Sequence, residues 1–376
     1  MKVLVALGTR PEVIKLAPVI AALRQRRLEV KVCASGQHRE MLQQALDAFG
    51  LCPDHMLDTM SPGRSLNILA ARLLEGMDAV LERERPDWVL AQGDTTTAFC
   101  AGLAAFQRQI RVGHVEAGLR TGDLSSPFPE EANRSLLARI ASLHFAPTRL
   151  AAQALRGEGV EAARVRVTGN TVVDAIHQVQ ASWPAGIPVS VPADIRARLE
   201  AGPAVLVTCH RRENFGSVME AFCQMLARLC ERYPKLQWIF PVHLNPAVQE
   251  PVHRLLGGHL NLLLTGPVDY HTSLYLISHA RLVLSDSGGI QEEAPTFGTP
   301  VVVMRQQTER MEGVQAGFAT LAGQDAQVIE AAVDAWLADE PRRRSLRARV
   351  NPYGDGQASA RIVAALLGEP CKDFCD

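Results

Sequence analysis

The sequence begins with MKVLVALGTRPEVIKLAPVIAALRQR, residues 1–26, and this stretch indicates the fold. Its apolar run at 3–7 predicts a short strand that ends in the loop Gly8-Thr9-Arg10-Pro11, and a helix is expected over 12–26. Proline suits the start of a helix, because the N–H group that it lacks would have no helical acceptor there. A short strand followed by a longer helix is the repeating unit of an α/β protein.

The same alternation continues along the chain. Further strands are expected at 30–34, 88–92, 111–115 and 143–146, with helices at 37–49, 65–85, 96–107 and 130–141. The stretch ASWPAGIPVSVP at 181–192 is rich in proline and small residues, which is typical of a domain boundary. Beyond it the pattern restarts, with apolar strands expected at 204–208, 238–242, 260–264, 282–285 and 301–304.

We therefore expect an α/β protein of two doubly wound, Rossmann-like domains, each with a parallel sheet covered on both faces. The N-terminal domain would span 1–180 and the C-terminal domain 181–355. A last helical segment and tail, 356–376, could pack on either domain. In such sheets ligands bind beyond the carboxyl ends of the strands, so the loops that follow strands are the candidate sites.

The composition is that of an ordinary globular protein. Lys+Arg 39 and Asp+Glu 40 give a formal net charge of -1, which argues against nucleic acid or an anionic membrane as partner. The 8 Cys form no CxxC pair, so no metal site is expected, and they are typical of a reducing compartment. Because no signal peptide and no apolar run of about 18 residues is visible, we expect a cytoplasmic protein.

The segment SDSGGIQEE at 285–293 follows an apolar strand and opens a helix. Gly288 and Gly289 permit a close approach of the backbone, and the N–H groups of a helix N-terminus after Ser287 favour an anion. Glu293 lies about one turn further on, where it can accept hydrogen bonds from ribose hydroxyls. These features predict a pyrophosphate site, with a serine-capped helix after a tight turn as the alternative. The segment fits neither GxGxxG nor a Walker A loop, so NAD and P-loop chemistry lose support.

Cationic side chains follow the first strand of each predicted domain. Arg10 and Lys15 lie in and after the loop of the first strand, and His210 with Arg211 follows the strand at 204–208. Arg10 and Lys15 could complement a phosphate, and His210 could donate to a phosphate or act as an acid. The alternatives are a solvated helix start for the first pair and a core histidine for His210.

Three carboxylates occupy strand-end or loop positions of the first domain. Asp94 follows the strand at 88–92, Glu116 follows the strand at 111–115, and Glu130 begins a helix. Carboxylates in different environments commonly divide acid and base work, so their convergence on one cleft would form a catalytic centre. Alternatively, Asp94 caps the next helix and Glu130 merely favours a helix N-terminus.

The motifs together resemble one family. GTRPE, QHREM, GDTTT, HVEAGLRTGD, PFPEEANR, TGNTV, HRREN, PVHLNP, SDSGGIQEEAP and NPYGDG follow in order over nearly the whole chain and are similar to those of the non-hydrolysing UDP-N-acetylglucosamine 2-epimerases. The resemblance implies a GT-B-like fold with the active site in the inter-domain cleft. It implies interconversion of UDP-GlcNAc and UDP-ManNAc without metal or NAD, in a homodimer that supplies bacterial surface polysaccharide.

The resemblance also assigns roles position by position. The catalytic residues would be Asp94, Glu116, Glu130 and His210. Substrate and UDP would contact Arg10, Lys15, Ser287, Gly288, Gly289, Glu293 and Arg310. On the uracil side stand Val268 and Ser273, where many relatives carry Gln and Phe, and the missing aromatic side chain departs from the family pattern. Positions of allosteric activation by UDP-GlcNAc would be Gln37, Arg211 and His243.

The chemistry of the sugar favours elimination. Its C2 proton has no adjacent carbonyl, so direct removal would leave a poorly stabilised carbanion, whereas loss of UDP from C1 as the C2 proton leaves gives 2-acetamidoglucal. Re-addition of UDP with protonation on the other face then yields the epimer. The alternatives are a GT-B glycosyltransferase, a hydrolysing epimerase and a non-catalytic nucleotide-sugar sensor, and the three carboxylates argue against the first and the last.

Overall fold

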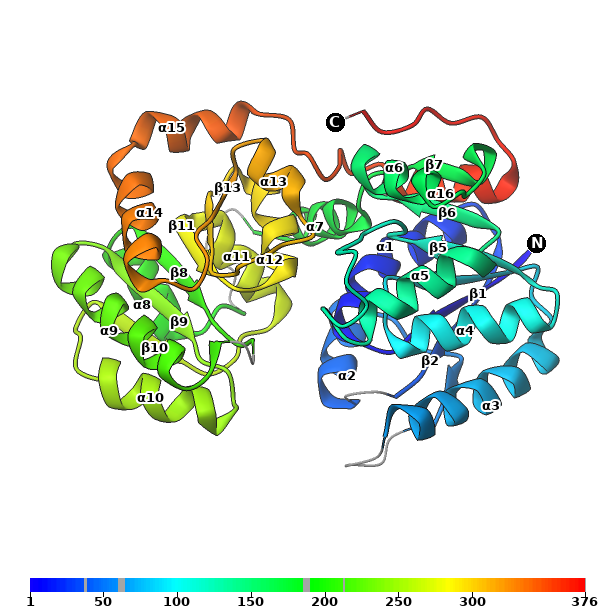
Figure 1. Ribbon diagram of the computed structural model, residues 1–376, viewed down its shortest axis with the longest axis horizontal. Coiled ribbons are helices and arrows are strands. Elements are labelled where there is room, and N and C mark those ends of the chain that lie inside the picture. Colours follow the sequence, from blue (N-terminus) through cyan, green and yellow to red (C-terminus); the bar gives the residue numbers. More distant parts are fainter. Residues whose placement is uncertain (37–38, 60–64, 185–189, 212–213, 376) are drawn as a thin grey trace. The chain divides into compact units, whose positions relative to one another are not determined.

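The computed structural model describes residues 1–376 apart from 37–38, 60–64, 185–189, 212–213 and 376 (Figure 1). The chain forms two compact units. Unit 1 consists of Met1–Gln178 and Tyr353–Asp376, and unit 2 consists of Val179–Pro352. Each unit is built around its own parallel sheet.

The sheet of unit 1 has the strand order β3-β2-β1-β4-β5-β6-β7. Its strands are β1 (Lys2–Leu7), β2 (Glu29–Ala34), β3 (His55–Met56), β4 (Trp88–Gln92), β5 (Arg111–Val115), β6 (Leu143–Ala146) and β7 (Val165–Val167). The helices are α1 (Arg10–Gln25), α2 (Arg39–Ala48), α3 (Leu66–Glu84), α4 (Thr96–Gln107), α5 (Glu130–Ile140), α6 (Arg149–Gly157), α7 (Thr171–Ala181) and α16 (Ala358–Leu367), with a 3-10 turn at Ala162–Arg164.

The alternation of side chains along β1 explains why helices cover both faces of this sheet. Val3, Val5 and Leu7 point to one face, where they pack with residues of α1, α2 and α16. Leu4 and Ala6 point to the other face, where they pack with residues of α3, α4 and α5. These five of the six residues of β1 are fully buried, as expected for a central strand of a parallel sheet.

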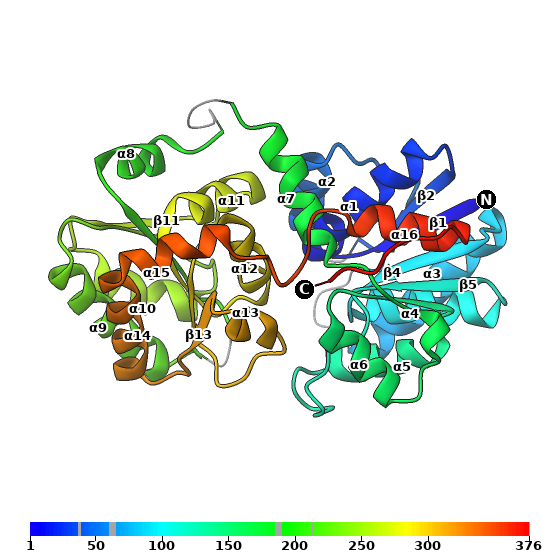
Figure 2. The same cartoon turned by 90° about the horizontal axis from the view of Figure 1, so that it is seen from above.

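The last helix, which the sequence left unplaced, belongs to unit 1. Figures 1 and 2 show α16 beside α1. Its N-terminus is fixed by Asp174 of α7, whose carboxylate accepts the backbone N–H groups of Ala358 at 3.2 Å and Ser359 at 2.8 Å. An acidic side chain at this position satisfies donors that have no partner within the helix.

The sheet of unit 2 has the order β10-β9-β8-β11-β12-β13. Its strands are β8 (Ala204–Thr208), β9 (Gln237–Pro241), β10 (Leu262–Thr265), β11 (Ala280–Ser285), β12 (Val301–Val303) and β13 (Ala319–Leu321). The helices are α8 (Ala193–Ala201), α9 (Ser217–Arg232), α10 (Pro246–Leu256), α11 (Tyr270–His279), α12 (Gly288–Glu293), α13 (Met311–Gln315), α14 (Ala326–Ala338) and α15 (Glu340–Ser345), with 3-10 turns at Ala294–Phe297 and Leu346–Ala348. Trp238 and Phe240 of β9 anchor a core shared with α9, α10 and α14.

Both units therefore have the doubly wound topology predicted from the sequence. In each sheet the order reverses beside the first strand, between β1 and β4 in unit 1 and between β8 and β11 in unit 2. At such a switch point the connections leave toward opposite faces and open a crevice at the carboxyl ends of the two strands. In the described part of the chain no helix is long and apolar enough to cross a bilayer.

Candidate functional site

The two switch points position the loops that the sequence singled out. In unit 1 the loop after β1 leads into Arg10, which is the first residue of α1 and not part of the loop as predicted, and the loop after β4 carries Asp94. In unit 2 the loop after β8 carries His210, and the turn after β11 leads into Gly288 at the start of α12. Each loop pair is adjacent because its strands are neighbours in the sheet, so the topology alone brings distant parts of the sequence together.

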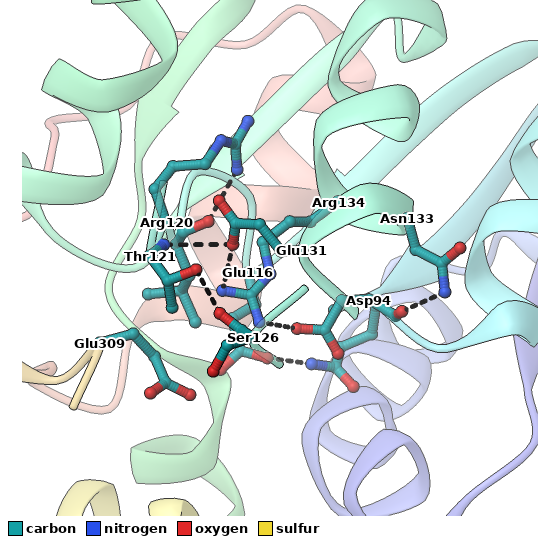
Figure 3. Close-up of polar contacts among 12 residues, drawn as sticks. Asp94, Glu116, Arg120, Thr121, Ser126, Glu131, Asn133, Arg134 and Glu309 are labelled. Carbon is teal, nitrogen blue, oxygen red and sulfur yellow. Dashed lines mark hydrogen bonds and ion pairs between the residues drawn. The ribbon is translucent and has the colours of Figure 1, made fainter. Parts of the chain in front are cut away.

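Asp94 is held by helix α5 rather than capping the helix that follows it. Arg134 donates to its carboxylate at 2.6 Å, and the side chain of Asn133 donates to its backbone carbonyl at 2.8 Å (Figure 3). The N-cap of α4 is the next residue, Thr95, whose hydroxyl accepts the N–H of Ala98. The capping alternative for Asp94 is therefore wrong, and its half-buried carboxylate is fixed against a guanidinium.

Glu116 is held in a strained conformation at the end of β5. Its φ of 61° lies in the left-handed region, which is costly for a residue with a long side chain and is common at functional sites. The buried carboxylate pairs with the ammonium of Lys15 and accepts the amide of Gln92. Asn170 adds a longer contact of 3.4 Å. The backbone conformation and the contacts with Lys15, Gln92 and Asn170 thus hold the Glu116 carboxylate in one orientation.

Glu130 lies on α5, the helix that also carries the two residues that hold Asp94. It is half-buried at the first position of the helix, one turn before Arg134, so both side chains lie on the face of α5 that contacts Asp94. Its neighbour Glu131 is buried and accepts the N–H groups of Thr121 and Gly122 at 3.1 Å each (Figure 3). Glu131 therefore organises the loop before the helix.

Glu12 links the loop after β1 to the loop after β4. Its buried carboxylate accepts the N–H of Gly8 at 3.0 Å and the hydroxyl of Thr95 at 2.8 Å. Burial raises the pKa of Glu12 to about 7, although hydrogen bonds from Thr9, Thr95 and Gly8 oppose the rise. The loop that precedes the half-buried Arg10 and the loop of Asp94 are therefore joined by one carboxylate.

In unit 2, His210 lies against the buried carboxylate of Asp286. The Nδ1 atom of the imidazole is 3.1 Å from Oδ1, and Oδ2 accepts the backbone N–H groups of His210 and Arg211. Burial alone would raise the pKa of Asp286, but the hydrogen bond and charge of His210 and these N–H groups outweigh it and lower the pKa to about 2. Asp286 is therefore a buried anion beside His210.

The residues predicted to contact UDP surround the turn into α12. Ser287 is the N-cap of that helix but makes no side-chain capping bond, and Gly288 follows it. A Cβ atom at Gly288 would lie 2.8 Å from the guanidinium carbon of Arg310, so glycine permits this close packing. Arg310 donates to Glu292 at 2.6 Å and also pairs with Glu309. Its guanidinium is therefore fixed over the turn.

The remaining predicted positions also lie in unit 2, with one exception. Gly289 and the buried Glu293 belong to α12. Val268 and Ser273 flank the N-cap of α11, both half-buried. The ring of His243 stacks on that of His210 with centroids 6.2 Å apart, and Arg211 donates to the backbone carbonyl of Asp286 at 3.1 Å. Gln37 lies outside the described residues.

The sequence analysis did not identify four residues that the structure places at the candidate site. Asn133 and Arg134 hold Asp94, Glu12 ties two loops together, and Asp286 contacts His210. Each stands inside a motif quoted above, but only the strand order shows which loop it meets. Among the described residues, no group of three or more His, Cys, Asp or Glu side chains is arranged to hold a metal ion.

Comparison with known proteins gives one consistent result. A sequence model of the UDP-N-acetylglucosamine 2-epimerase family matches residues 21–367. The chain is 49% identical to the UDP-N-acetylglucosamine 2-epimerase of Yersinia pestis over 375 residues, covering 97% of this chain and 98% of the relative. It superposes on the UDP-GlcNAc 2-epimerase of Neisseria meningitidis bound to UDP-GlcNAc with a TM-score of 0.89 and 42% identity, covering 98% of this chain and 100% of that one.

A more distant likeness concerns the fold alone. The glycotransferase of kitacinnamycin has a TM-score of 0.63 at 15% identity, covering 97% of this chain. The two-domain architecture is thus GT-B-like, as the sequence predicted. Taken with the extent of the match over both units, these similarities show that the chain belongs to the UDP-N-acetylglucosamine 2-epimerase family.

Proposed function

We propose that this protein interconverts UDP-GlcNAc and UDP-ManNAc by eliminating UDP and adding it back. The observation that carries the proposal is the pair of carboxylates at neighbouring strand ends, Asp94 and Glu116, each paired with its own cation. The relatives named as UDP-N-acetylglucosamine 2-epimerases, and the one solved with UDP-GlcNAc, support the choice of substrate.

The reaction is balanced without a cofactor. A carboxylate takes the C2 proton, the C–H electron pair becomes the second bond between C1 and C2, and the C1–O bond breaks so that UDP departs with its electron pair. In the return step a β-phosphate oxygen of UDP attacks C1 while C2 receives a proton on the opposite face. The glucal intermediate must be kept in the site between the two steps, because its escape would end the cycle.

Paired carboxylates suit a reversible epimerisation. One carboxylate faces each side of C2, and the residue that is the base in one direction is the acid in the other. Each carboxylate must therefore be an anion before the reaction in one of its two directions, with UDP-GlcNAc bound or with UDP-ManNAc bound. Lys15 beside Glu116 and Arg134 beside Asp94 provide a counter-charge for that anion. Glu130, one turn from Arg134, completes the acid–base set.

Unit 2 would hold the leaving group. Backbone N–H groups at Gly288 and Gly289 and the guanidinium of Arg310 face the diphosphate, Glu293 binds the ribose, and the segment of Val268 and Ser273 faces uracil. His210 donates a hydrogen bond to the departing phosphate. Unit 1 would supply the carboxylates that act on the sugar, and Arg10 would contribute a further positive charge. The product would supply ManNAc for bacterial surface polysaccharide, and the enzyme would act as a homodimer.

Positional isotope exchange tests the elimination step. UDP-GlcNAc carrying ¹⁸O in the bridge between C1 and the β-phosphorus is incubated with the enzyme, and the recovered nucleotide sugar is examined by ³¹P NMR. Elimination frees the β-phosphate to rotate, so ¹⁸O should scramble into its non-bridging positions as UDP-ManNAc forms. Epimerisation with the label still in the bridge would contradict C1–O cleavage. Release of free ManNAc and UDP would indicate a hydrolysing enzyme.

A further inference from the structure

The side chain of Asp286 is the most completely enclosed carboxylate beside the candidate site. It is 0% exposed, and its Oδ2 atom accepts three N–H groups: the backbone of His210 at 2.9 Å, the backbone of Arg211 at 2.8 Å and the side chain of Asn214 at 2.9 Å. Its Oδ1 atom lies 3.1 Å from Nδ1 of His210. One buried group therefore holds the backbone of His210 and lies within ion-pair distance of its ring.

The structure assigns Asp286 the role of a positioning residue that holds His210 with Nδ1 protonated and Nε2 directed at the departing phosphate, and this inference rests on the function proposed above. A carboxylate is only an acceptor, so the nitrogen that faces it must carry the proton. A neutral imidazole that faces no carboxylate can carry its proton on either nitrogen. In the doubly protonated ring the Nε2–H group can give its proton to the leaving oxygen during elimination, and the neutral ring that results keeps its proton on Nδ1 and can take the other one back at Nε2 during re-addition.

The surroundings of the ring make this constraint necessary. The side chain of His210 is 42% exposed, so packing alone would not hold its orientation. Among the residues that the structure describes, the charged and titratable neighbours are Arg211, whose Nε donates to the Asp286 carbonyl, and His243, whose ring stacks on His210. Arg211 places a permanent positive charge next to the ring. Asp286 supplies the counter-charge on the same side.

A second aspartate in unit 2 shows what a purely structural role looks like. Asp325 caps α14 by accepting the backbone N–H groups of Gln327 at 2.8 Å and Val328 at 3.3 Å. It thus makes the same kind of backbone contact as Asp286, but no histidine is involved in its cap. Asp325→Asn is therefore the matched control for Asp286→Asn.

Replacement by asparagine separates the two roles of Asp286. The amide oxygen of Asn can still accept the three N–H groups, so the loop should keep its conformation. The amide nitrogen is a donor, and it would face Nδ1 and favour the tautomer with the proton on Nε2. In the Ser-His-Asp triad of serine proteases, the same exchange leaves the geometry intact but gives the wrong tautomer. Asp286→Asn should thus lower kcat by at least about 100-fold while KM for UDP-GlcNAc stays within about threefold.

The test is a double-mutant cycle with His210→Gln. If Asp286 acts through His210, Asp286→Asn should cost no more than about threefold in kcat once the histidine is gone. A further loss of about 100-fold in that background would overturn the proposal, because Asp286 would then act on something else. Asp325→Asn should leave kcat unchanged in both backgrounds.

Nitrogen NMR of the wild-type protein gives a readout that does not depend on activity. With ¹⁵N-labelled histidine, and the His210 signals assigned by their loss in His210→Gln, the neutral ring should carry its proton on Nδ1. A proton on Nε2 would overturn the proposal, and this holds even if Asp286→Asn fails to fold. If wild-type enzyme produced no UDP-ManNAc, the proposed function would fail, whereas the tautomer would still decide whether Asp286 positions the ring.

Discussion

Replacing Glu12 with glutamine should change how the stability of this protein depends on pH. Glu12 is buried between the loops after β1 and β4, where its carboxylate accepts the N–H of Gly8 and the hydroxyl of Thr95. Glutamine has the same shape and can accept from Gly8 while donating to Thr95. The exchange therefore removes the titratable group and leaves most of the packing in place.

The magnitude follows from the raised pKa. Burial moves the pKa of Glu12 from 4.5 to about 7, and one pKa unit corresponds to about 1.4 kcal/mol. Below pH 4.5 the carboxyl is protonated in both the folded and unfolded chains. Between 4.5 and about 7 only the unfolded chain releases the proton, so the free energy of unfolding falls as pH rises, by roughly 3 kcal/mol in all. Above that range the dependence on this group ends.

Thermal unfolding of the two proteins between pH 4.5 and 8 measures the effect. Relative to Glu12→Gln, the wild type should lose stability as pH rises, and the difference in Tm should change by roughly 6–12 °C for a domain of this size. The exposed Glu161 provides the control, since Glu161→Gln should parallel the wild type throughout. A difference between wild type and Glu12→Gln that stayed constant with pH would refute the reasoning, because Glu12 would then titrate as it does in the unfolded chain.

Three further substitutions test the site and its support. Asp94→Asn should lower kcat at least about 100-fold while the Kd for UDP, measured by calorimetry, changes only a few-fold, and near-normal turnover would remove Asp94 from the chemistry. Gly118→Ala should lower Tm well beyond Gly122→Ala, because both glycines have positive φ but only a Cβ atom at Gly118 would clash with a backbone oxygen, that of Ala151. Equal Tm values for the two variants would contradict this packing. Gly288→Ala should displace Arg310 and weaken UDP binding about tenfold. The control Gly258→Ala, which has open space around its Cβ position, should bind UDP normally. Unchanged UDP affinity in Gly288→Ala would exclude the turn from the nucleotide site.

The sequence predicted the central strands but not three of the edge strands. The apolar runs that became β1, β4 and β8 are buried on both faces, so they are continuous and easily recognised. The strands that escaped prediction, β3, β7 and β13, lie at the edges of the two sheets and are two or three residues long. A short strand that is paired on one side only needs no apolar run.

The positions of the candidate residues after strands could be predicted from the sequence, but the contacts that hold them could not. The position of Asp94 and Glu116 after strands was evident, because both follow apolar runs and belong to polar motifs. Their adjacency depends on the pairing of β4 with β5, which spacing along the chain does not reveal. The pairing of Asp94 with Arg134 similarly depends on how α5 packs beside the loop after β4. Contacts of this kind are created by the tertiary fold.

Proton exchange at C2 tests the central claim most directly. The purified protein is incubated with UDP-GlcNAc in D₂O without added metal or NAD, and the sugar is followed by proton NMR. The proposed mechanism predicts UDP-ManNAc that carries deuterium at C2, because the base releases the original proton to solvent and the acid delivers a new one. UDP-ManNAc that kept its original proton, or UDP-GlcNAc that remained unchanged, would contradict it.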